Sequence, residues 1–200
     1  MQIVCSDLEG IFTPEIWINV AEKTGIDELK LTTRDIPDYD ELMRKRLSIL
    51  NANDIKLPTI TEVIDTMQPL PGAAEFLTWL RQRTPVIVLS DTYVEFARPL
   101  MAQLGWPTLF CHHLTVDGDG RIQNYNLRQK DMKSKAVRAM KGLNFETIAI
   151  GDSYNDITML QAADHGFLFR PPDSVKDRFP QFPVSDTYAE LQNKLAAVLD

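Results

Sequence analysis

The chain has 200 residues, of which 44% are hydrophobic and 24% are charged, and its formal net charge is −7. This length and composition are typical of an ordinary globular protein with one sizeable core and room for a small added module. The negative charge argues against a surface for nucleic acid or anionic membranes, because such surfaces need clustered Lys and Arg. We therefore expect neither nucleic acid nor a membrane as a partner.

The cysteines and the N-terminal residues indicate where the protein works. Only two cysteines occur, Cys5 and Cys111, and both fall in predicted buried strands. No disulfide framework is expected, which favours a reducing compartment. The first residues lack the basic region and long apolar stretch of a signal peptide, and no later apolar run is long enough to span a bilayer. The predicted location is the cytoplasm.

The first predicted strand, Ile3-Val4-Cys5, is followed by Gly10, which lets the chain turn away from the sheet. Three helical segments are then predicted from apolar residues at helical spacing, with a C-terminal cap at Gly25 and a break at Pro37-Asp38. The apolar sets are Ile16, Trp17, Val20 and Ala21; Leu42, Leu47, Ile49 and Leu50; and Ile60, Val63, Ile64 and Met67. Pro69-Leu70-Pro71-Gly72 ends this helical region.

Beyond that point, predicted helices alternate with strands. Val86-Ile87-Val88-Leu89 is a continuous apolar run of the kind that parallel strands show, and Ser90-Asp91-Thr92 is predicted to end it. Further strands are predicted over residues 147–150 and 167–169, and helices around residues 76–80, 96–104, 136–140 and 191–198. Pro99 predicts a kink or a late start in the second of these helices.

Asp117-Gly118-Asp119-Gly120 predicts a hairpin turn between residues 114–116 and 121–123. A calcium loop is the rival interpretation, but Arg121 and Arg128 occupy positions where an EF-hand needs acidic ligands. The hairpin is therefore favoured.

The order of elements is one strand, an all-helical insertion, and then βαβ units. This order predicts an α/β fold with a Rossmann-like parallel sheet flanked by helices, made by residues 1–12 and 70–200. Residues 13–69 would form a small helical cap inserted after the first strand.

Acidic residues follow two of the predicted strands: Asp7 and Glu9 follow the first, and Asp152 and Asp156 follow the strand at residues 147–150. Because the carboxyl ends of parallel strands lie at one edge of a sheet, these acids should gather there. Two carboxylates about 4 Å apart repel each other by roughly 4 kcal/mol at an effective dielectric near 20. The cluster therefore predicts a divalent-metal site.

Several other kinds of site are excluded by the motifs that the chain lacks. It has no Gly-x-x-x-x-Gly-Lys phosphate loop, no Gly-x-Gly-x-x-Gly after a strand and no Gly-x-Ser-x-Gly elbow. His112 and His113 are adjacent and would point to opposite sides of a strand, which argues against a zinc cluster. Neither cysteine is followed six residues later by Arg, which weakens a thiol-based phosphatase.

Four motifs in chain order resemble those of the haloacid dehalogenase (HAD) superfamily. They are Asp7-Leu8-Glu9-Gly10, Ser90 after a strand, Lys133 at the start of a helix, and Gly151-Asp152-Ser153-Tyr154-Asn155-Asp156. Almost the whole chain further resembles the bifunctional phosphoserine phosphatase/homoserine phosphotransferase proteins of this superfamily, on residues 7–10, 14–18, 21–27, 32–40, 128–131 and 179–183. The resemblance implies the HAD fold, with the small helical cap of phosphoserine phosphatases.

This resemblance implies an Mg²⁺-dependent phosphoserine phosphatase that can also transfer the phosphoryl group to homoserine. Asp7 would attack phosphorus to form an aspartyl-phosphate, and Glu9 would act as general acid and then general base. The metal would be held by Asp7, the main-chain carbonyl of Glu9, and Asp152. Glu9 departs from the commoner second Asp of the superfamily's phosphatases, and its extra methylene moves the proton-transferring oxygen.

The same resemblance implies the residues that bind the substrate, a small phosphorylated amino acid. Its phosphoryl oxygens would bind Ser90 and Lys133, its ammonium Glu15, and its carboxylate Arg46, with Asn155 orienting the substrate or the metal shell. Asp91 is also expected at this site, but it stands where phosphoserine phosphatases typically have Gly, so it adds negative charge near the phosphate.

Some alternatives stay open at this point. Lys130 and Lys135 are rivals to Lys133, and Asp156 could support the site without binding metal. The chain could be a phosphatase of another small phosphorylated metabolite, or a catalytically silent module that binds amino acids or a partner; a dehalogenase is disfavoured by Glu9 and Asp152. A homodimer is also open.

Overall fold

A computed structural model describes residues 1–32, 35–36 and 38–199 of the chain. These residues form a seven-stranded sheet in the order β4-β3-β2-β1-β5-β6-β7. All neighbouring strands in it are parallel except the β3–β4 pair. The strands are β1 (Gln2–Ser6), β2 (Val86–Tyr93), β3 (Thr108–Val116), β4 (Ile122–Asn126), β5 (Glu146–Gly151), β6 (His165–Phe169) and β7 (Val184–Ser185). The predicted α/β fold with a Rossmann-like parallel sheet is confirmed.

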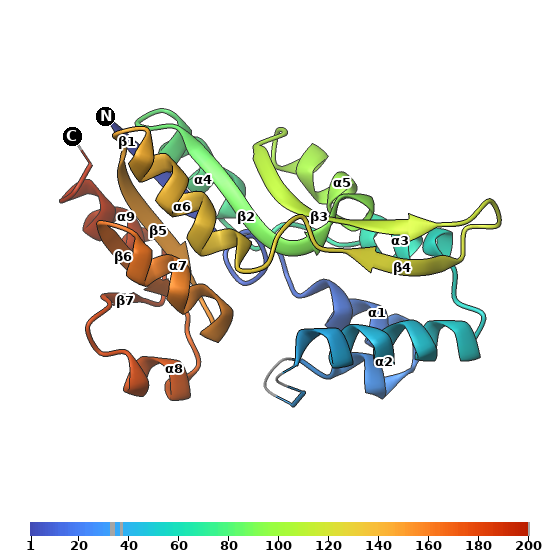
Figure 1. The fold of residues 1–200 in the computed structure, drawn as a ribbon. Helices are drawn as coiled ribbons and strands as arrows, with labels where there is room; N and C mark the ends of the chain where they lie inside the picture. The colour runs from blue at the N-terminus through green and yellow to red at the C-terminus, as the bar shows by residue number, and fades with distance from the viewer. Residues whose placement is uncertain (33–34, 37, 200) are drawn as a thin grey trace.

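Helices cover both faces of this sheet (Figure 1). They are α1 (Ile16–Thr24), α2 (Tyr39–Ala52), α3 (Leu57–Asp65), α4 (Ala73–Arg81), α5 (Val94–Gln103), α6 (Met132–Gly142), α7 (Ile157–Ala162), α8 (Asp173–Arg178) and α9 (Tyr188–Ala196). Two 3₁₀ turns, η1 (Asp27–Lys30) and η2 (Tyr154–Asp156), complete the described elements.

Alternate residues of each central strand belong to two different apolar clusters. In β1, Val4 packs in the cluster that includes residues of α4, α5 and α9, whereas Ile3 and Cys5 pack in the cluster that includes residues of α6, α7 and α8. In β2, Val88 and Leu89 divide between the two clusters in the same way. Because both faces are buried, the middle positions of these strands are apolar, which explains the continuous apolar runs in the sequence.

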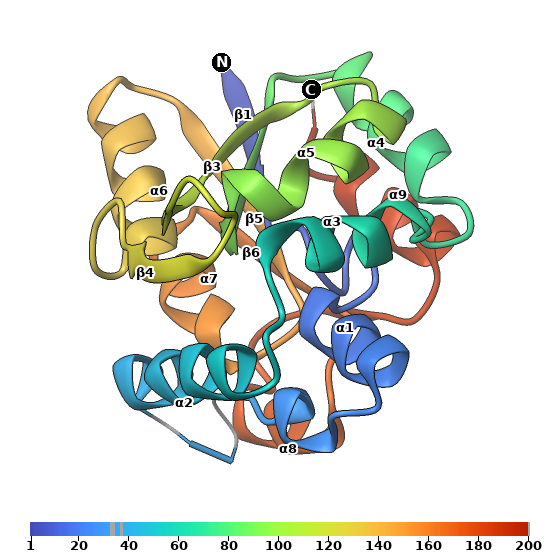
Figure 2. The ribbon, with the colours of Figure 1, turned by 90° about the vertical axis from the view of Figure 1, so that its right-hand side faces the viewer.

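The helical insertion lies at the carboxyl ends of the strands, where α1 and α2 stand beyond the sheet (Figures 1 and 2). Helix α3 instead packs against α1 and α5. The chain leaves and re-enters the sheet-bearing part at one point, because the Leu70 amide donates to the Phe12 carbonyl at 2.9 Å. The cluster that contains Val20 of α1 and Ile60 of α3 also contains Phe96 of α5, so the division into a core of residues 1–12 and 70–200 and a cap of residues 13–69 stays a prediction.

Two local predictions are corrected by the structure. Strand β2 does not end at Ser90 but continues through Asp91 to Tyr93, with a register shift between Leu89 and Tyr93. Helix α5 begins at Val94, so the late start at Pro99 is wrong and the proline lies inside the helix. A proline lacks an amide donor but does not prevent the turns before it from forming.

Other local predictions are confirmed. Gly25 caps α1 in the left-handed region with φ +71°. The turn after Val116 is a hairpin, in which the Asp117 carboxylate accepts the amide hydrogens of Asp119 and Arg121. The predicted break at Pro37-Asp38 lies partly outside the described residues, since Pro37 is not among them. Across the described part of the chain, every helix is too short or too polar to cross a bilayer.

Candidate active site

A cavity of about 210 Å³ lies where β1, β2 and β5 end. Its lining contains all nine residues predicted from the sequence: Asp7, Glu9, Glu15, Arg46, Ser90, Asp91, Lys133, Asp152 and Asn155. Pockets for drug-sized ligands are commonly about 300–1,000 Å³, so this volume fits a smaller metabolite. The structure therefore brings together side chains from both halves of the sheet and from the helical insertion.

Asp7 directly follows β1, and its amide donates to the Ile150 carbonyl of β5 at 2.9 Å. The side chain is buried, and its Oδ1 accepts from the Leu8 amide at 2.7 Å and faces the Lys133 Nζ at 2.9 Å. Burial and then the charge of Asp156 raise the pKa of Asp7 well above its usual range, although Lys133 opposes this shift. A positive charge beside Asp7 therefore stabilises its anionic form.

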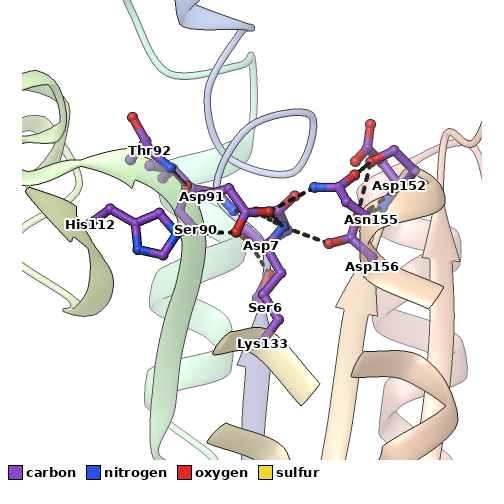
Figure 3. Close-up of polar contacts among 12 residues, drawn as sticks. Ser6, Asp7, Ser90, Asp91, Thr92, His112, Lys133, Asp152, Asn155 and Asp156 are labelled. Carbon is purple, nitrogen blue, oxygen red and sulfur yellow. Dashed lines mark hydrogen bonds and ion pairs between the residues drawn. The ribbon is translucent and has the colours of Figure 1, made fainter. Parts of the chain in front are cut away.

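Lys133, in the first turn of α6, supplies that positive charge. Its Nζ lies 2.7 Å from Asp156, 2.9 Å from Asp7 and 3.5 Å from Asp91 (Figure 3). Burial alone would lower the pKa of this lysine, but the nearby carboxylates, Asp156 first, raise it well above its usual range. Lys133 is thus an ammonium paired with Asp156 and Asp7, with Asp91 farther away, whereas its rivals Lys130 and Lys135 are exposed.

Asp156 orders the loop that follows β5. Its Oδ1 accepts from Lys133 at 2.7 Å, and its Oδ2 accepts from the amides of Asp152 and Ser153 at 2.9 and 3.1 Å. The carboxylate is fully buried, and a Cβ added at Gly151 would lie 2.4 Å from the Asp156 Cβ. Asp156 therefore sits behind the cavity wall, consistent with a supporting role.

The donor set of this site suits a hard divalent cation. Carboxylate oxygens of Asp7, Asp152 and Asp156 lie within 4.8 Å of one another. Burial, and next the charges of Asp156 and Glu15, raise the pKa of Asp152 to about 7. Since Lys133 alone faces this cluster of acids among the described cations, an oxygen-liganded ion such as Mg²⁺ would relieve the remaining repulsion. Asp7 and Asp152 line the cavity and could hold such an ion.

Glu9 connects the loop after β1 to the helical insertion. Its Oε2 accepts from the Ile16 amide at 2.8 Å, at the first residue of α1. Burial and then repulsion by Glu15 raise the pKa of Glu9 to about 8. Without a metal, Glu9 therefore holds its proton near neutral pH and can donate it to a leaving group.

Arg46 of α2 brings a cation into the cavity from the opposite side. It is 7% exposed, and its guanidinium lies over the Trp17 ring at 4.5 Å while Nη2 donates to the Leu31 carbonyl at 2.7 Å. The buried Nε has no hydrogen-bond partner among the described residues. A buried, unpaired donor of this kind is costly unless an anion or other acceptor binds it.

Two residues that contact the site, Tyr39 and His112, are not among the site residues predicted from the sequence. Tyr39 of α2 donates its hydroxyl hydrogen to the Asp91 carbonyl at 3.2 Å, and His112 of β3 faces the Asp91 carboxylate at 3.5 Å. In the sequence, His112 is notable only because its adjacency to His113 argues against a zinc cluster. Both residues reach Asp91 through long-range packing, so spacing along the chain could not have placed them there.

The comparisons with known proteins agree with this fold. The family model for haloacid dehalogenase-like hydrolases matches residues 6–164, so the chain belongs to that family. The match begins at the end of β1 and runs past the loop that carries Asp152 and Asp156. The resemblance inferred from the four motifs is thereby confirmed.

Individual relatives are similar over nearly the whole chain. The chain is 57% identical to "Phosphoserine phosphatase ThrH" of Pseudomonas aeruginosa, over 97% of this chain and 95% of that protein. It is 56% identical to "Phosphoserine phosphatase" of Pseudomonas syringae pv. tomato, over 97% of this chain and 82% of that protein. A solved structure of phosphoserine phosphatase in apo form aligns with a TM-score of 0.74 at 22% identity, over 88% of this chain and 90% of that one, which supports the fold alone.

The position of Asp152 depends on the lack of a side chain at Gly10. A Cβ there would lie 2.5 Å from the Asp152 Oδ2, and Gly10 has φ +78°. We expect Gly10→Ala to displace the carboxylate and to weaken Mg²⁺ binding about 10–100-fold, measured by calorimetric titration. Gly25→Ala is the matched control, since Gly25 has φ +71° but nothing within 4 Å of an added Cβ. Equal metal affinity in the two variants would contradict the placement of Asp152.

The raised pKa values of Asp152 and Glu9 predict how stability depends on pH in the metal-free protein. Between about pH 5 and pH 8 the folded state keeps protons on these groups that the unfolded state has lost, so the free energy of unfolding should fall as pH rises. Because a metal needs the ionised carboxylate, added Mg²⁺ should stabilise the protein more at pH 8 than at pH 6. Denaturation curves with EDTA or Mg²⁺ measure both effects, and Asp152→Asn should remove most of the Mg²⁺ effect. Metal-free stability that increases over this range would contradict these shifts.

Proposed function

We propose that this protein is an Mg²⁺-dependent phosphoserine phosphatase that acts through an aspartyl-phosphate on Asp7. The observation that carries the proposal is the buried contact of Asp7 with Lys133 at 2.9 Å, beside carboxylates that suit a divalent cation. The names of the relatives at 57% and 56% identity support phosphoserine as the substrate. The catalytically silent module is disfavoured, because these charged groups are all retained in one cavity.

The first chemical step would transfer the phosphoryl group to the protein. The Leu8 amide and Lys133 both contact Oδ1 of Asp7, which leaves Oδ2 as the oxygen to attack phosphorus. The new bond joins this oxygen to phosphorus, the bond from phosphorus to the serine oxygen breaks, and Glu9 gives that oxygen its proton. In the second step a water oxygen attacks phosphorus, Glu9 takes the water's proton, and the bond to Asp7 breaks to release phosphate.

The cation and Lys133 would neutralise charge during both steps. Asp7, the main-chain carbonyl of Glu9, and Asp152 would hold Mg²⁺, which supplies electrostatic stabilisation of the phosphoryl oxygens when bound. Lys133 and Ser90 would hold the same oxygens from the protein side. Uncatalysed hydrolysis of phosphate monoesters is slow enough for enzymes to reach accelerations of ~10²¹-fold, so concentrated positive charge is required.

The amino-acid end of the substrate would lie against the helical insertion. Glu15, directly before α1, would bind the ammonium, and the guanidinium of Arg46 would bind the carboxylate with the unpaired Nε among its donors. Asn155 would orient the substrate from the loop after β5. The small volume of the cavity supports an amino-acid phosphate rather than a larger ester.

We also propose homoserine as an alternative acceptor to water. Homoserine carries the same ammonium and carboxylate as serine, so Glu15 and Arg46 would bind it in the place that serine leaves. Its hydroxyl oxygen would then attack phosphorus while Glu9 takes the hydroxyl proton. The homodimer and the cytoplasmic location stay predictions.

One observation favours a second candidate, a phosphatase of another small phosphorylated metabolite. Asp91 lines the cavity as an additional acid. Burial opposes its ionisation, but Lys133, His112 and Asn155 outweigh this effect and lower its pKa, so the residue is anionic at neutral pH. An acid here, where phosphoserine phosphatases typically have Gly, adds negative charge beside the phosphoryl site, and a substrate other than phosphoserine could offset it with hydrogen-bond donors.

Removing the nucleophile tests the covalent mechanism. We expect Asp7→Asn to lower phosphoserine turnover at least about 10³-fold, because the amide cannot form the intermediate. The exposed Asp173→Asn in α8 is a charge-matched control and should keep wild-type turnover. Rapid acid quenching with labelled phosphoserine, followed by peptide mapping, should place phosphate on Asp7. Retained turnover in Asp7→Asn, or no phosphate on this residue, would reject the mechanism.

The substrate and the acceptor can be tested together by ³¹P NMR. With phosphoserine and homoserine, the wild-type protein should form both inorganic phosphate and phosphohomoserine. Arg46→Ala should lower both rates about 10–100-fold through loss of a charged hydrogen-bond partner, while hydrolysis of p-nitrophenyl phosphate, which lacks the carboxylate, changes little. Absence of phosphohomoserine would leave only the hydrolase. Slow phosphoserine turnover that is unaffected by Arg46→Ala would favour the second candidate.

A further inference from the structure

The Asp91 carboxylate lies among three hydrogen-bond donors at the end of β2 (Figure 3). Its Oδ1 is 3.5 Å from the His112 Nε2. Its Oδ2 is 3.1 Å from the Asn155 Nδ2 and 3.5 Å from the Lys133 Nζ. The Asp91 main-chain carbonyl is held separately, by the Tyr39 hydroxyl at 3.2 Å. The backbone is thus fixed, while the carboxylate has a choice of partners.

The partner that the Asp91 carboxylate takes affects Lys133, because an ammonium has only three hydrogen-bond donors. Asp156 and Asp7 occupy two donors of Lys133 at 2.7 and 2.9 Å, whereas Asp91 is more distant at 3.5 Å. The third donor is therefore the one that a phosphoryl oxygen in the cavity can use. Asp91 would compete with the phosphoryl group for this donor, because both are anionic acceptors and both Asp91 and Lys133 line the cavity.

Asp91 is also the least buried of the three acids around Lys133. The side chains of Asp7 and Asp156 are 6% and 0% exposed, whereas the Asp91 side chain is 37% exposed and lines the cavity. A shift of less than 1 Å would bring its Oδ2 to normal hydrogen-bond distance from Lys133. Unlike charges attract more strongly as they approach, so this shift is favourable unless something restrains the carboxylate.

His112 is placed to supply that restraint. The ring is buried on β3, and its Nδ1 accepts the Arg128 amide hydrogen at 3.1 Å. A neutral imidazole that accepts at one nitrogen carries its hydrogen on the other, so the main chain sets the tautomer with a donor at Nε2. The Nε2 lies 3.5 Å from the Asp91 Oδ1, on the side of the carboxylate away from Lys133.

We propose that His112 is a positioning residue that holds the Asp91 carboxylate off Lys133 and so keeps one lysine donor free for the phosphoryl group of the substrate. The proposal deepens the proposed function, since it rests on a phosphorylated substrate binding at this site. The proposed role of His112 involves only the phosphoryl group, so it does not depend on what the rest of the substrate is. Asn155 restrains the other carboxylate oxygen, and His112 decides which way the first one points.

Two substitutions separate the bonds of the histidine. His112→Asn keeps an acceptor where Nδ1 meets the Arg128 amide but has no donor at the position of Nε2. His112→Gln places an amide NH₂ near the Nε2 position and can keep the contact with Asp91. Both variants are made in the wild-type protein and in Asp91→Ala, which has no carboxylate to restrain.

The measured quantities are the KM and kcat for p-nitrophenyl phosphate and the inhibition constant of inorganic phosphate. In the wild-type background, His112→Asn should raise KM and the inhibition constant about tenfold, the effect of one charge-assisted hydrogen bond, with kcat changed less than about threefold. His112→Gln should change them much less. In the Asp91→Ala background, His112→Asn should change neither constant more than about twofold.

Loss of phosphate affinity that persists in the Asp91→Ala background would overturn the proposal, because His112 would then act through packing alone. An unchanged inhibition constant in His112→Asn would overturn it too. If Asp91→Ala folds poorly by thermal denaturation, Asp91→Asn, which removes the charge and keeps the shape, takes its place. Both probes lack the amino-acid group, so a protein that fails to turn over phosphoserine still tests the role of His112.

Discussion

The contact of Lys133 with Asp7 and Asp156 is the interaction on which the rest of the site depends. A buried ammonium is strongly unfavourable unless it is paired and hydrogen bonded, and here it lies 2.7 and 2.9 Å from two buried carboxylates. These three residues come from the end of β1, the start of α6 and the loop after β5. One ion cluster therefore joins the nucleophile candidate to the two segments that surround it, and it fixes the direction in which Asp7 faces the cavity.

The cluster contains more negative than positive charge, and this excess is chemically useful. Burial and then the charge of Asp156 raise the pKa of Asp152 to about 7, and burial and then the charge of Glu15 raise that of Glu9 to about 8. The repulsion around Asp152 is what a bound cation would relieve, and the shift at Glu9 leaves a proton where a leaving group would need it. The parallel sheet makes this possible by directing several strand ends, and the acids that follow them, toward one cavity.

Asp91 is unfavourable for phosphate binding, because its carboxylate is anionic and lines the cavity that is expected to bind phosphate. His112, Asn155 and Tyr39 surround it from three other elements, so the surrounding structure specifies the position of this acid closely. Groups that are unfavourable for simple binding but closely restrained are commonly retained for function. The restraint offers a physical reason why an acid can be tolerated beside the phosphoryl site.

The sequence by itself determined the α/β class, the chain order of most elements and the acids that follow two strands, because apolar runs and strand-end acids are local patterns. It also indicated the family through the motifs around Asp7 and Asp152. Only the tertiary structure decided that Lys133, rather than Lys130 or Lys135, reaches the acids, since Lys133 lies on the buried face of α6, Lys135 on its exposed face, and Lys130 before the helix. The extension of β2 past its predicted end and the meeting of His112 with Asp91 depend on packing between separate strands. Local spacing carries no information about such contacts, because they form only when distant segments fold onto one sheet.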